Sequence, residues 1–245
     1  IVDPSILSII LNVTFKFDSN ATTNNRESLE TLVSDTITDY NNNYLKVFNS
    51  IFRHSQFTTL IDASETSILN NTTTVALSSL YTPDTAGAFS FNVQFGNQLY
   101  NPHSGHNSTA GGIIASTGFF IQDNTNEMFF DDDGAGNLRI YYLSAAARTY
   151  FDTNAGTVNY ATGLVSANPV YITSVSNVDN VLSRSIRLTA TPASNDIVAK
   201  RNQIIEIDLV NTLVEGQGDT IVVNSSGGGS TNYVATSTYV SPSSY

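Results

Sequence analysis

Hydrophobic and polar residues alternate along the first segment of the chain, Ile6–Phe17. Leu11, Val13, Phe15 and Phe17 are separated by single polar residues, so they fall on one face of an extended backbone. A period of two is typical of a strand with one buried face. The segment therefore predicts a strand that packs one side against a core.

A helical period follows the first strand. Apolar residues recur at helical spacing over Arg26–Tyr40, and Asn24 with Glu27 predicts a reciprocal cap at the start. A shorter helix is expected over Ser55–Ala63, and Ile68–Leu80, rich in Thr and Val, predicts a returning strand. The order of strand, helix, helix and strand predicts a small α+β unit over residues 1–85.

The pattern changes after a break at Pro83–Gly87. The sequence predicts short strands at 89–95, 113–122, 127–130, 137–144, 148–151, 157–160, 170–175, 185–191 and 203–209. Turn clusters at 131–136, 152–156, 161–163 and 192–196 separate them. This spacing is typical of an antiparallel β domain, either a sandwich or a barrel, over residues 86–215. The overall fold class is therefore predicted as α+β.

The last part of the chain, residues 216–245, is rich in Gly, Ser and Thr and is too poor in apolar residues for a core of its own. It still contains Tyr233, Tyr239 and Tyr245, which are possible anchors on a partner. A disordered terminus is the alternative interpretation. Apolar alternation around Val222 and Val234 favours a strand-like tail that lies on another subunit.

Composition narrows the possible functions. Hydrophobic residues form 40% of the chain and charged residues only 13%, while Ser, Thr and Asn together supply 85 of 245 residues. A net charge of −11 argues against nucleic-acid grooves and anionic lipid surfaces. The absence of Cys excludes disulfides and thiolate chemistry, and no apolar run is long enough to span a membrane. A start at Ile1 with no signal peptide suggests a piece of a longer chain.

Candidate catalytic and metal-binding residues are few. His103 and His106 share a Gly-rich loop and could supply two metal ligands, whereas zinc requires three or four. Asp131–Gly136 is rich in carboxylates but lacks the ligand spacing of a calcium loop, and it predicts a hairpin turn instead. A catalytic pair of carboxylates cannot be identified by sequence alone. We therefore expect neither an enzyme nor a bound cofactor or metal.

The sparse basic residues are candidates for protein contacts. Arg139 and Arg148 fall in the predicted β domain, and Arg is enriched at interface centres because its planar group forms paired hydrogen bonds. Pairing with a nearby Asp on the surface is the alternative for each. Low charge over the whole chain fits a surface that is covered by neighbours.

Several segments together resemble a known family. Tyr44–Leu80, with FRHSQFTTLID followed by SILNN, resembles the baseplate J-like family, and within it the C-terminal portion of the wedge proteins of T-even-type contractile-tail phages. Phe130–Leu143, Gly156–Val165 and Ser194–Asp208 resemble later segments of the same proteins. The resemblance extends over most of residues 1–210, and residues 216–245 have no recognised counterpart.

The resemblance implies a structural virion protein. Such wedge subunits form the inner ring of a tail baseplate, pair as dimers within it, contact other wedge and hub proteins, and rearrange on contraction. Assembly is then expected in the cytoplasm of the bacterial host. The alternative is a receptor- or glycan-binding tail module, for which Tyr141, Tyr142 and Tyr150 could offer aromatic surfaces. Strand alternation directs Tyr141 and Tyr142 to opposite faces, which weakens a shared platform.

Overall fold

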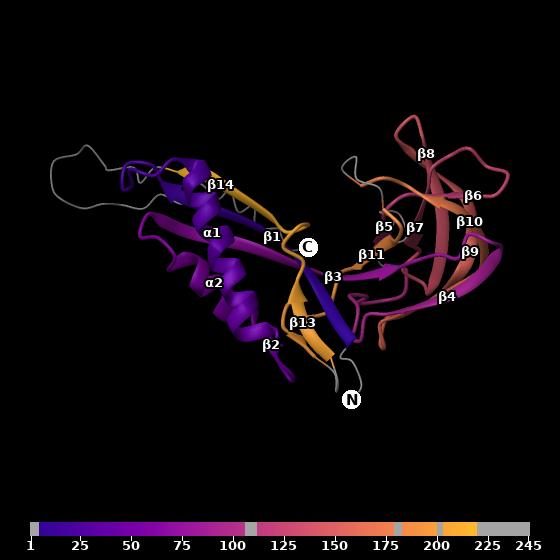
Figure 1. Cartoon of the computed structure of the whole chain (residues 1–245), viewed down its shortest axis with the longest axis horizontal. Helices are drawn as coiled ribbons and strands as arrows, with labels where there is room; N and C mark the ends of the chain where they lie inside the picture. Colours follow the sequence, from indigo (N-terminus) through magenta and orange to yellow (C-terminus); the bar gives the residue numbers. More distant parts are fainter. Residues whose placement is uncertain (1–4, 106–111, 179–182, 200–202, 220–245) are drawn as a thin grey trace, which may run out of the picture.

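The structure is a computed structural model that describes residues 5–105, 112–178, 183–199 and 203–219. It has two lobes joined by a long strand (Figure 1). The first lobe begins with β1 (Ser5–Asp18), α1 (Arg26–Tyr40), the π-helix η1 (Asn41–Leu45), β2 (Ile51–Phe52), α2 (His54–Asp62) and β3 (Ile68–Tyr81). The remaining strands are β4 (Ala88–Gln94), β5 (Ile114–Ser116), β6 (Phe119–Ile121), β7 (Met128–Asp132), β8 (Asn137–Ser144), β9 (Ala147–Asn159), β10 (Leu164–Val175), β11 (Ile186–Ala190), β12 (Ile197–Val198), β13 (Gln203–Ile207) and β14 (Leu213–Asp219).

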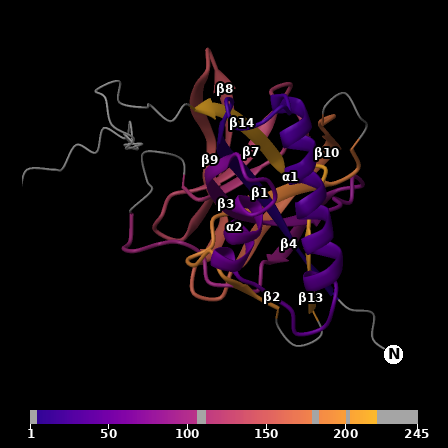
Figure 2. The same ribbon diagram turned by 90° about the vertical axis from the view of Figure 1, so that its left-hand side faces the viewer.

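The early helices and strands confirm the predicted order, and the α+β class is confirmed. Every second residue of β1 is buried, in a row from Leu7 to Phe17, as the alternation predicts. Burial of one such side chain is worth about 1.5–3 kcal/mol relative to exposure. Figure 2 shows α1 and α2 on one face of the sheet that contains β1 and β3, which is where this apolar row needs cover.

Helix α1 has the predicted bounds, but its capping residue is one position later than predicted. The side chain of Asn25, not Asn24, accepts a hydrogen bond from the Ser28 backbone N–H at 2.8 Å. The helix buries Leu29, Val33 and Ile37, which are spaced by four residues and therefore share one face. It then widens into η1 at Asn41, so the Asn-rich segment continues the helical path.

Two parallel strands complete the first sheet. Its order is β13-β1-β3-β11-β5, and β14 pairs with β1 beyond the end of β13. Both β13 and β14 run parallel to β1, whereas β3 runs antiparallel to it. The sheet is thus mixed, and strands from the end of the described chain lie beside the first strand. The first residues of the predicted tail, 216–219, belong to β14, and the rest of the tail lies outside the described residues.

The second sheet closes on itself. Its order is β4-β10-β6-β7-β8-β9, and β10 also pairs with β9. The sequence left a sandwich and a barrel open. The closed sheet is a small barrel, and β4 is an additional strand that pairs with β10. Strand β3 links the lobes because it pairs with β1 along most of its length and with β11 at Leu77–Tyr81.

Two predicted boundaries in the barrel are wrong. The turn expected at residues 152–156 lies inside the continuous strand β9. Gly156 is needed there for close approach, because a Cβ at this position would lie 2.1 Å from the Ser166 carbonyl oxygen of β10. The single strand expected at residues 113–122 is two strands, β5 and β6, which belong to different sheets and flank Gly118.

Candidate interaction surfaces

The acidic segment Asp131–Gly136 contains the predicted hairpin turn between β7 and β8, although Asp131 and Asp132 still belong to β7 and the turn is residues 133–136. Gly134 and Gly136 have positive φ angles of 71° and 109°, which glycine adopts without a steric penalty. The Asp133 carboxylate accepts hydrogen bonds from the backbone of Ala135 at 2.8 Å and of Asn137 at 3.0 Å. Burial acts to raise the pKa of Asp133, but these bonds and one from the Asn137 side chain outweigh it and lower the pKa.

Asp131 is the centre of a buried ionic cluster that we call the Asp131 cluster, formed with Arg139, Arg148 and Tyr150. Its Oδ1 accepts from Arg139 Nε at 2.8 Å, and its Oδ2 accepts from Arg148 at 2.8 Å and from the Tyr150 hydroxyl at 3.1 Å. Asp131 is 1% exposed. Burial raises the pKa of Asp131, while the hydrogen bond and charge of Arg139 act against that rise. The cluster ties β7, β8 and β9 together.

Asp132 connects the hairpin to the rest of the barrel. Its Oδ1 accepts from the backbone N–H groups of Ile113 and Ile114 at 2.6 and 2.7 Å, and its Oδ2 accepts from the Tyr160 hydroxyl at 2.6 Å. Burial and the bond to Asp132 both raise the pKa of Tyr160. The carboxylates of this turn therefore hold protein groups, and no trio of His, Asp or Glu side chains in the described ranges is placed to hold a metal ion.

A row of aromatic side chains lies beside the Asp131 cluster on the barrel and shares Tyr150 with it. The ring centroids of Phe129 and Tyr141 lie 5.5 Å apart, and those of Tyr141 and Tyr150 lie 6.1 Å apart. Arg139 stacks over Tyr150 at 4.2 Å, and Arg148 over Tyr141 at 4.6 Å. Tyr150, rather than Tyr142, shares a face with Tyr141, and the two arginines already cover these rings.

The predicted interface residues have different surroundings. Arg139 is buried inside the Asp131 cluster, which leaves its guanidinium little surface for a partner, whereas the side chain of Arg148 is 39% exposed. Tyr233, Tyr239 and Tyr245 lie outside the described residues. An interface role for these five residues stays a prediction.

His54 and His103, the two histidines within the described ranges, belong to no group of three potential metal ligands. The backbone N–H of His54 donates to Asp196 at 2.8 Å, and its Nε2 lies 2.9 Å from the Thr73 carbonyl oxygen, so it joins α2, β3 and the segment before β12. His103 is exposed in the loop after β4, and its predicted partner His106 lies outside the described residues.

A group of exposed apolar side chains, which the sequence did not predict, lies on η1, on the segment after it and on the β2–β12 ribbon. We call it the β2 patch, and it consists of Tyr44, Val47, Phe48, Ile51 and Val198. Each of these is between 40% and 58% exposed. Ile51 and Val198 are direct cross-strand partners in the two-stranded β2–β12 ribbon, so their side chains share a face. In the sequence, the adjacent Val47 and Phe48 could have indicated this patch, because they fit neither the helical nor the alternating period of apolar residues.

No helix in the described ranges combines the length and apolar character needed to cross a membrane.

Comparison with known proteins identifies one part of the chain. Residues 5–79 match the family described as baseplate structural protein gp6, C-terminal domain III, a component of the phage baseplate. The matched segment runs from the start of β1 almost to the end of β3 and includes four of the five residues of the β2 patch. No curated protein matches the chain. The resemblance to a phage baseplate component is thereby confirmed within residues 5–79. The assignment to the baseplate J-like family and to a wedge protein, and the resemblance of the later segments, stay predictions.

Proposed function

We propose that this protein is a structural virion subunit of a phage tail baseplate. The observation that carries the proposal is the family match over residues 5–79, which extends from the start of β1 almost to the end of β3. In this role the chain is a wedge subunit of the inner ring of a contractile tail, and it rearranges when the tail contracts. It acts without catalysis, cofactor or metal, and is assembled into the tail in the host cytoplasm.

A structural subunit acts through its contacts with other subunits, and we propose the β2 patch as a surface that makes such contacts. It gathers five large apolar side chains on η1, the segment after it, and the β2–β12 ribbon. Apolar patches on a soluble surface commonly mark protein contacts. A two-stranded ribbon also has open edges to which another chain can add. We propose that this patch contacts a second copy within a ring or another wedge or hub protein.

The oligomeric state of the full chain tests the proposal. Light scattering at micromolar concentration should show a dimer or larger assembly, and Phe48→Ser should shift it toward the monomer because it removes an apolar anchor of the patch. Leu143→Ser is the matched control, since Leu143 is similarly exposed on the other lobe. A wild type that stays monomeric over the whole concentration range contradicts a self-association role for the patch.

A cryo-electron microscopy map of the assembled particle tests the ring. Copies related by twofold axes should close a ring about the tail axis, and residues beyond 219 should follow the surface of a neighbouring chain. The proposal for the tail is independent of the ring: if deletion of residues 220–245 leaves assembly unchanged, the tail contact is wrong while the ring stands.

The second candidate function is a receptor- or glycan-binding tail module. The aromatic row of Phe129, Tyr141 and Tyr150 gives it little support because arginines stack over the two tyrosine rings. A cavity elsewhere on the barrel supports carbohydrate binding more directly, and it is compatible with a place in the baseplate.

A further inference from the structure

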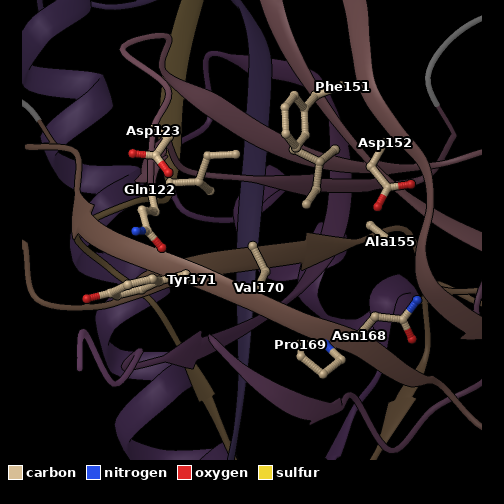
Figure 3. Close-up of a pocket in the computed structure, with 11 residues that line it drawn as sticks. Gln122, Asp123, Phe151, Asp152, Ala155, Asn168, Pro169, Val170 and Tyr171 are labelled. Carbon is tan, nitrogen blue, oxygen red and sulfur yellow. The ribbon is translucent and has the colours of Figure 1, made fainter. Parts of the chain in front are cut away.

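The barrel has a cavity of about 280 Å³ lined by residues of β6, β8, β9 and β10 and the turn after β6 (Figure 3). Phe151 and Asp152 of β9 border it on one side, Asp123 follows β6 on another, and Asn168 and Val170 of β10 complete it. Its size is close to the lower end of small-molecule sites, which range from about 300 to 1,000 Å³. The cavity is well separated from the β2 patch, which lies on the other lobe.

Two bulges shape this cavity. In β9, Asp152 pairs with Ile140 and Tyr150 pairs with Tyr141, so Phe151 is the extra residue. In β10, the register shifts between Ala167 and Val170, where Asn168 and Pro169 interrupt the pairing with β4. Bulges redirect side chains and are frequent beside binding sites. Here both bulges border the same hollow.

The turn after β6 supplies the third side. Asp123 has a φ of 59°, a left-handed conformation that few residues other than glycine adopt, although Asp tolerates it better than most. The backbone N–H of the neighbouring Gln122 donates to the Tyr171 carbonyl oxygen at 3.0 Å, which fixes the turn against β10. In Figure 3 the carboxylates of Asp123 and Asp152 lie on opposite sides of the apolar Val170.

The polar side chains of the cavity are held in place and have capacity left for a ligand. The Asp152 Oδ1 accepts from the Asn154 backbone N–H at 2.8 Å, and the Asn168 amide donates to the Asn154 carbonyl oxygen at 2.9 Å. Their other oxygens have no assigned hydrogen-bond donor within the described part of the chain, nor has the carboxylate of Asp123. Phe151 is 53% exposed at the rim and offers an aromatic face.

This combination selects a class of ligand. Carboxylate and amide oxygens accept hydrogen bonds from hydroxyl groups, and an aromatic face with an aliphatic floor suits the C–H face of a sugar ring. Neither Lys nor Arg is among the residues that line the cavity, so an anionic ligand would meet uncompensated carboxylates. A bare divalent cation fits less well, because only two carboxylates line the cavity and much of its wall is apolar.

We propose that this cavity binds an uncharged hexose residue of a glycan. The ring stacks against Phe151, and its hydroxyl groups donate to Asp123 and Asp152. The inference is independent of the proposed structural role, since it uses none of the residues that match the baseplate family.

Glycan binding by the full chain tests the proposal. A glycan array identifies binders, and saturation-transfer NMR with the corresponding methyl hexosides measures the contact of a single ring. We expect a dissociation constant on the order of 1 mM for one ring. Phe151→Ala should weaken binding by about tenfold, and Asp152→Asn should also weaken it. Leu143→Ala, an exposed change in the adjacent β8, should leave the affinity within about twofold.

Other outcomes overturn the proposal. They are the absence of any hexose-containing binder, binding that Phe151→Ala and Asp152→Asn leave unchanged, or binding of Ca²⁺ alone that depends on Asp123 and Asp152. Because Phe151 and Asp152 are exposed, both variants should keep the thermal midpoint of the wild type, and this measurement separates lost binding from lost folding. A monomeric protein that still binds hexosides would contradict the assembly role and leave this inference intact.

Discussion

The two lobes are held together by different chemistry. The first lobe packs Tyr40, Phe52 and Phe57 into one aromatic group with ring centroids 5.3–6.0 Å apart, and the rest of its core is mostly aliphatic, with Phe15 and Phe17 of β1. The barrel also has an apolar interior, but beside it lie the buried carboxylates of Asp131 and Asp132. Charged residues are scarce in this chain, and the barrel nevertheless buries several of them in one place.

The difference shows what each lobe has to specify. Apolar packing is favourable in many arrangements, whereas each carboxylate of the barrel is satisfied only when particular donors on other strands are in register. Strand β9 is long and bulged, and β8 could pair with it in shifted registers. We infer that the Asp131 cluster selects one register, while the first lobe gains most of its stability from buried apolar area.

The largest expected effect comes from the aromatic group of the first lobe. Phe57→Ala should lower the free energy of unfolding by about 3–5 kcal/mol, because it leaves a cavity against Tyr40 and Phe52. Urea denaturation measures the change, and Phe89→Ala, at an exposed position, should cost much less. Hydrogen exchange should accelerate in β1, β3 and α2 more than in β7–β9. Equal acceleration of hydrogen exchange in both lobes would contradict the view that the aromatic group stabilises mainly the first lobe.

The next effect separates the two arginines of the barrel. Arg139→Met should destabilise by about 3 kcal/mol, because it leaves the buried Asp131 short of a partner. Arg148→Met should cost about 1 kcal/mol or less, since that side chain is partly exposed. The loss in Arg139→Met should shrink on acidification, because a protonated Asp131 needs no cation. Urea midpoints at several pH values measure both, and equal costs for the two variants would contradict a buried ionic centre.

A smaller effect concerns Asn41, a buried side-chain amide of the first lobe. The Oδ1 of Asn41 accepts from the Ile207 backbone N–H at 2.9 Å and so joins η1 to β13. Asn41→Ala should cost about 1–3 kcal/mol, because it leaves this buried N–H without an acceptor. Asn42→Ala, an exposed neighbour in η1, is the control. If the two variants denature at the same urea concentration, the hydrogen bond between Asn41 and Ile207 adds little to stability. The first lobe would then depend even more on apolar packing than the barrel does.

The smallest effect is a pH dependence in the hairpin turn. Folding lowers the pKa of Asp133 below 3.8, the value of an unperturbed Asp side chain. The ionised carboxylate therefore stabilises the fold fully above the unfolded pKa, and this stabilisation is lost as the pH falls through the folded pKa. The difference in urea midpoint between the wild type and Asp133→Asn should therefore narrow from neutral pH to acidic pH. Asp35→Asn, on the exposed face of α1, is the control variant. A gap that is constant with pH would contradict the hydrogen-bonded carboxylate.

Local patterns in the sequence predicted much of the first lobe. The alternation in Ile6–Phe17 and the helical spacing in Arg26–Tyr40 report directly which side chains face a core, and both appear in the structure. Strand partners are not encoded in the same way. Nothing in Gln203–Ile207 or Leu213–Asp219 indicates that both segments run parallel to a strand 200 residues earlier, because that choice depends on the folded chain.

The interaction surfaces were predictable only in part. A hairpin was expected with its turn over Asp131–Gly136, but β7 continues to Asp132, so the predicted turn left out the pairing of Asp131 with Arg139. The β2 patch depends on which side of a short ribbon the chain leaves uncovered. The cavity beside Phe151 depends on two bulges, which look in the sequence like an ordinary turn and a proline within a strand.

The parallel pairing of β13 and β14 with β1 determines the order in which the strands of the first sheet can assemble during synthesis. The backbone N–H of Leu11 bonds to Thr212, 201 residues later, so β1 emerges from the ribosome long before its outer neighbours exist. Contacts of such long sequence separation slow folding and leave an open strand edge while synthesis continues. The nascent chain therefore carries an unfinished sheet until its last described strands arrive. Once they do, the beginning and the end of the described chain close one sheet together, and the first lobe matures only after the barrel has been made.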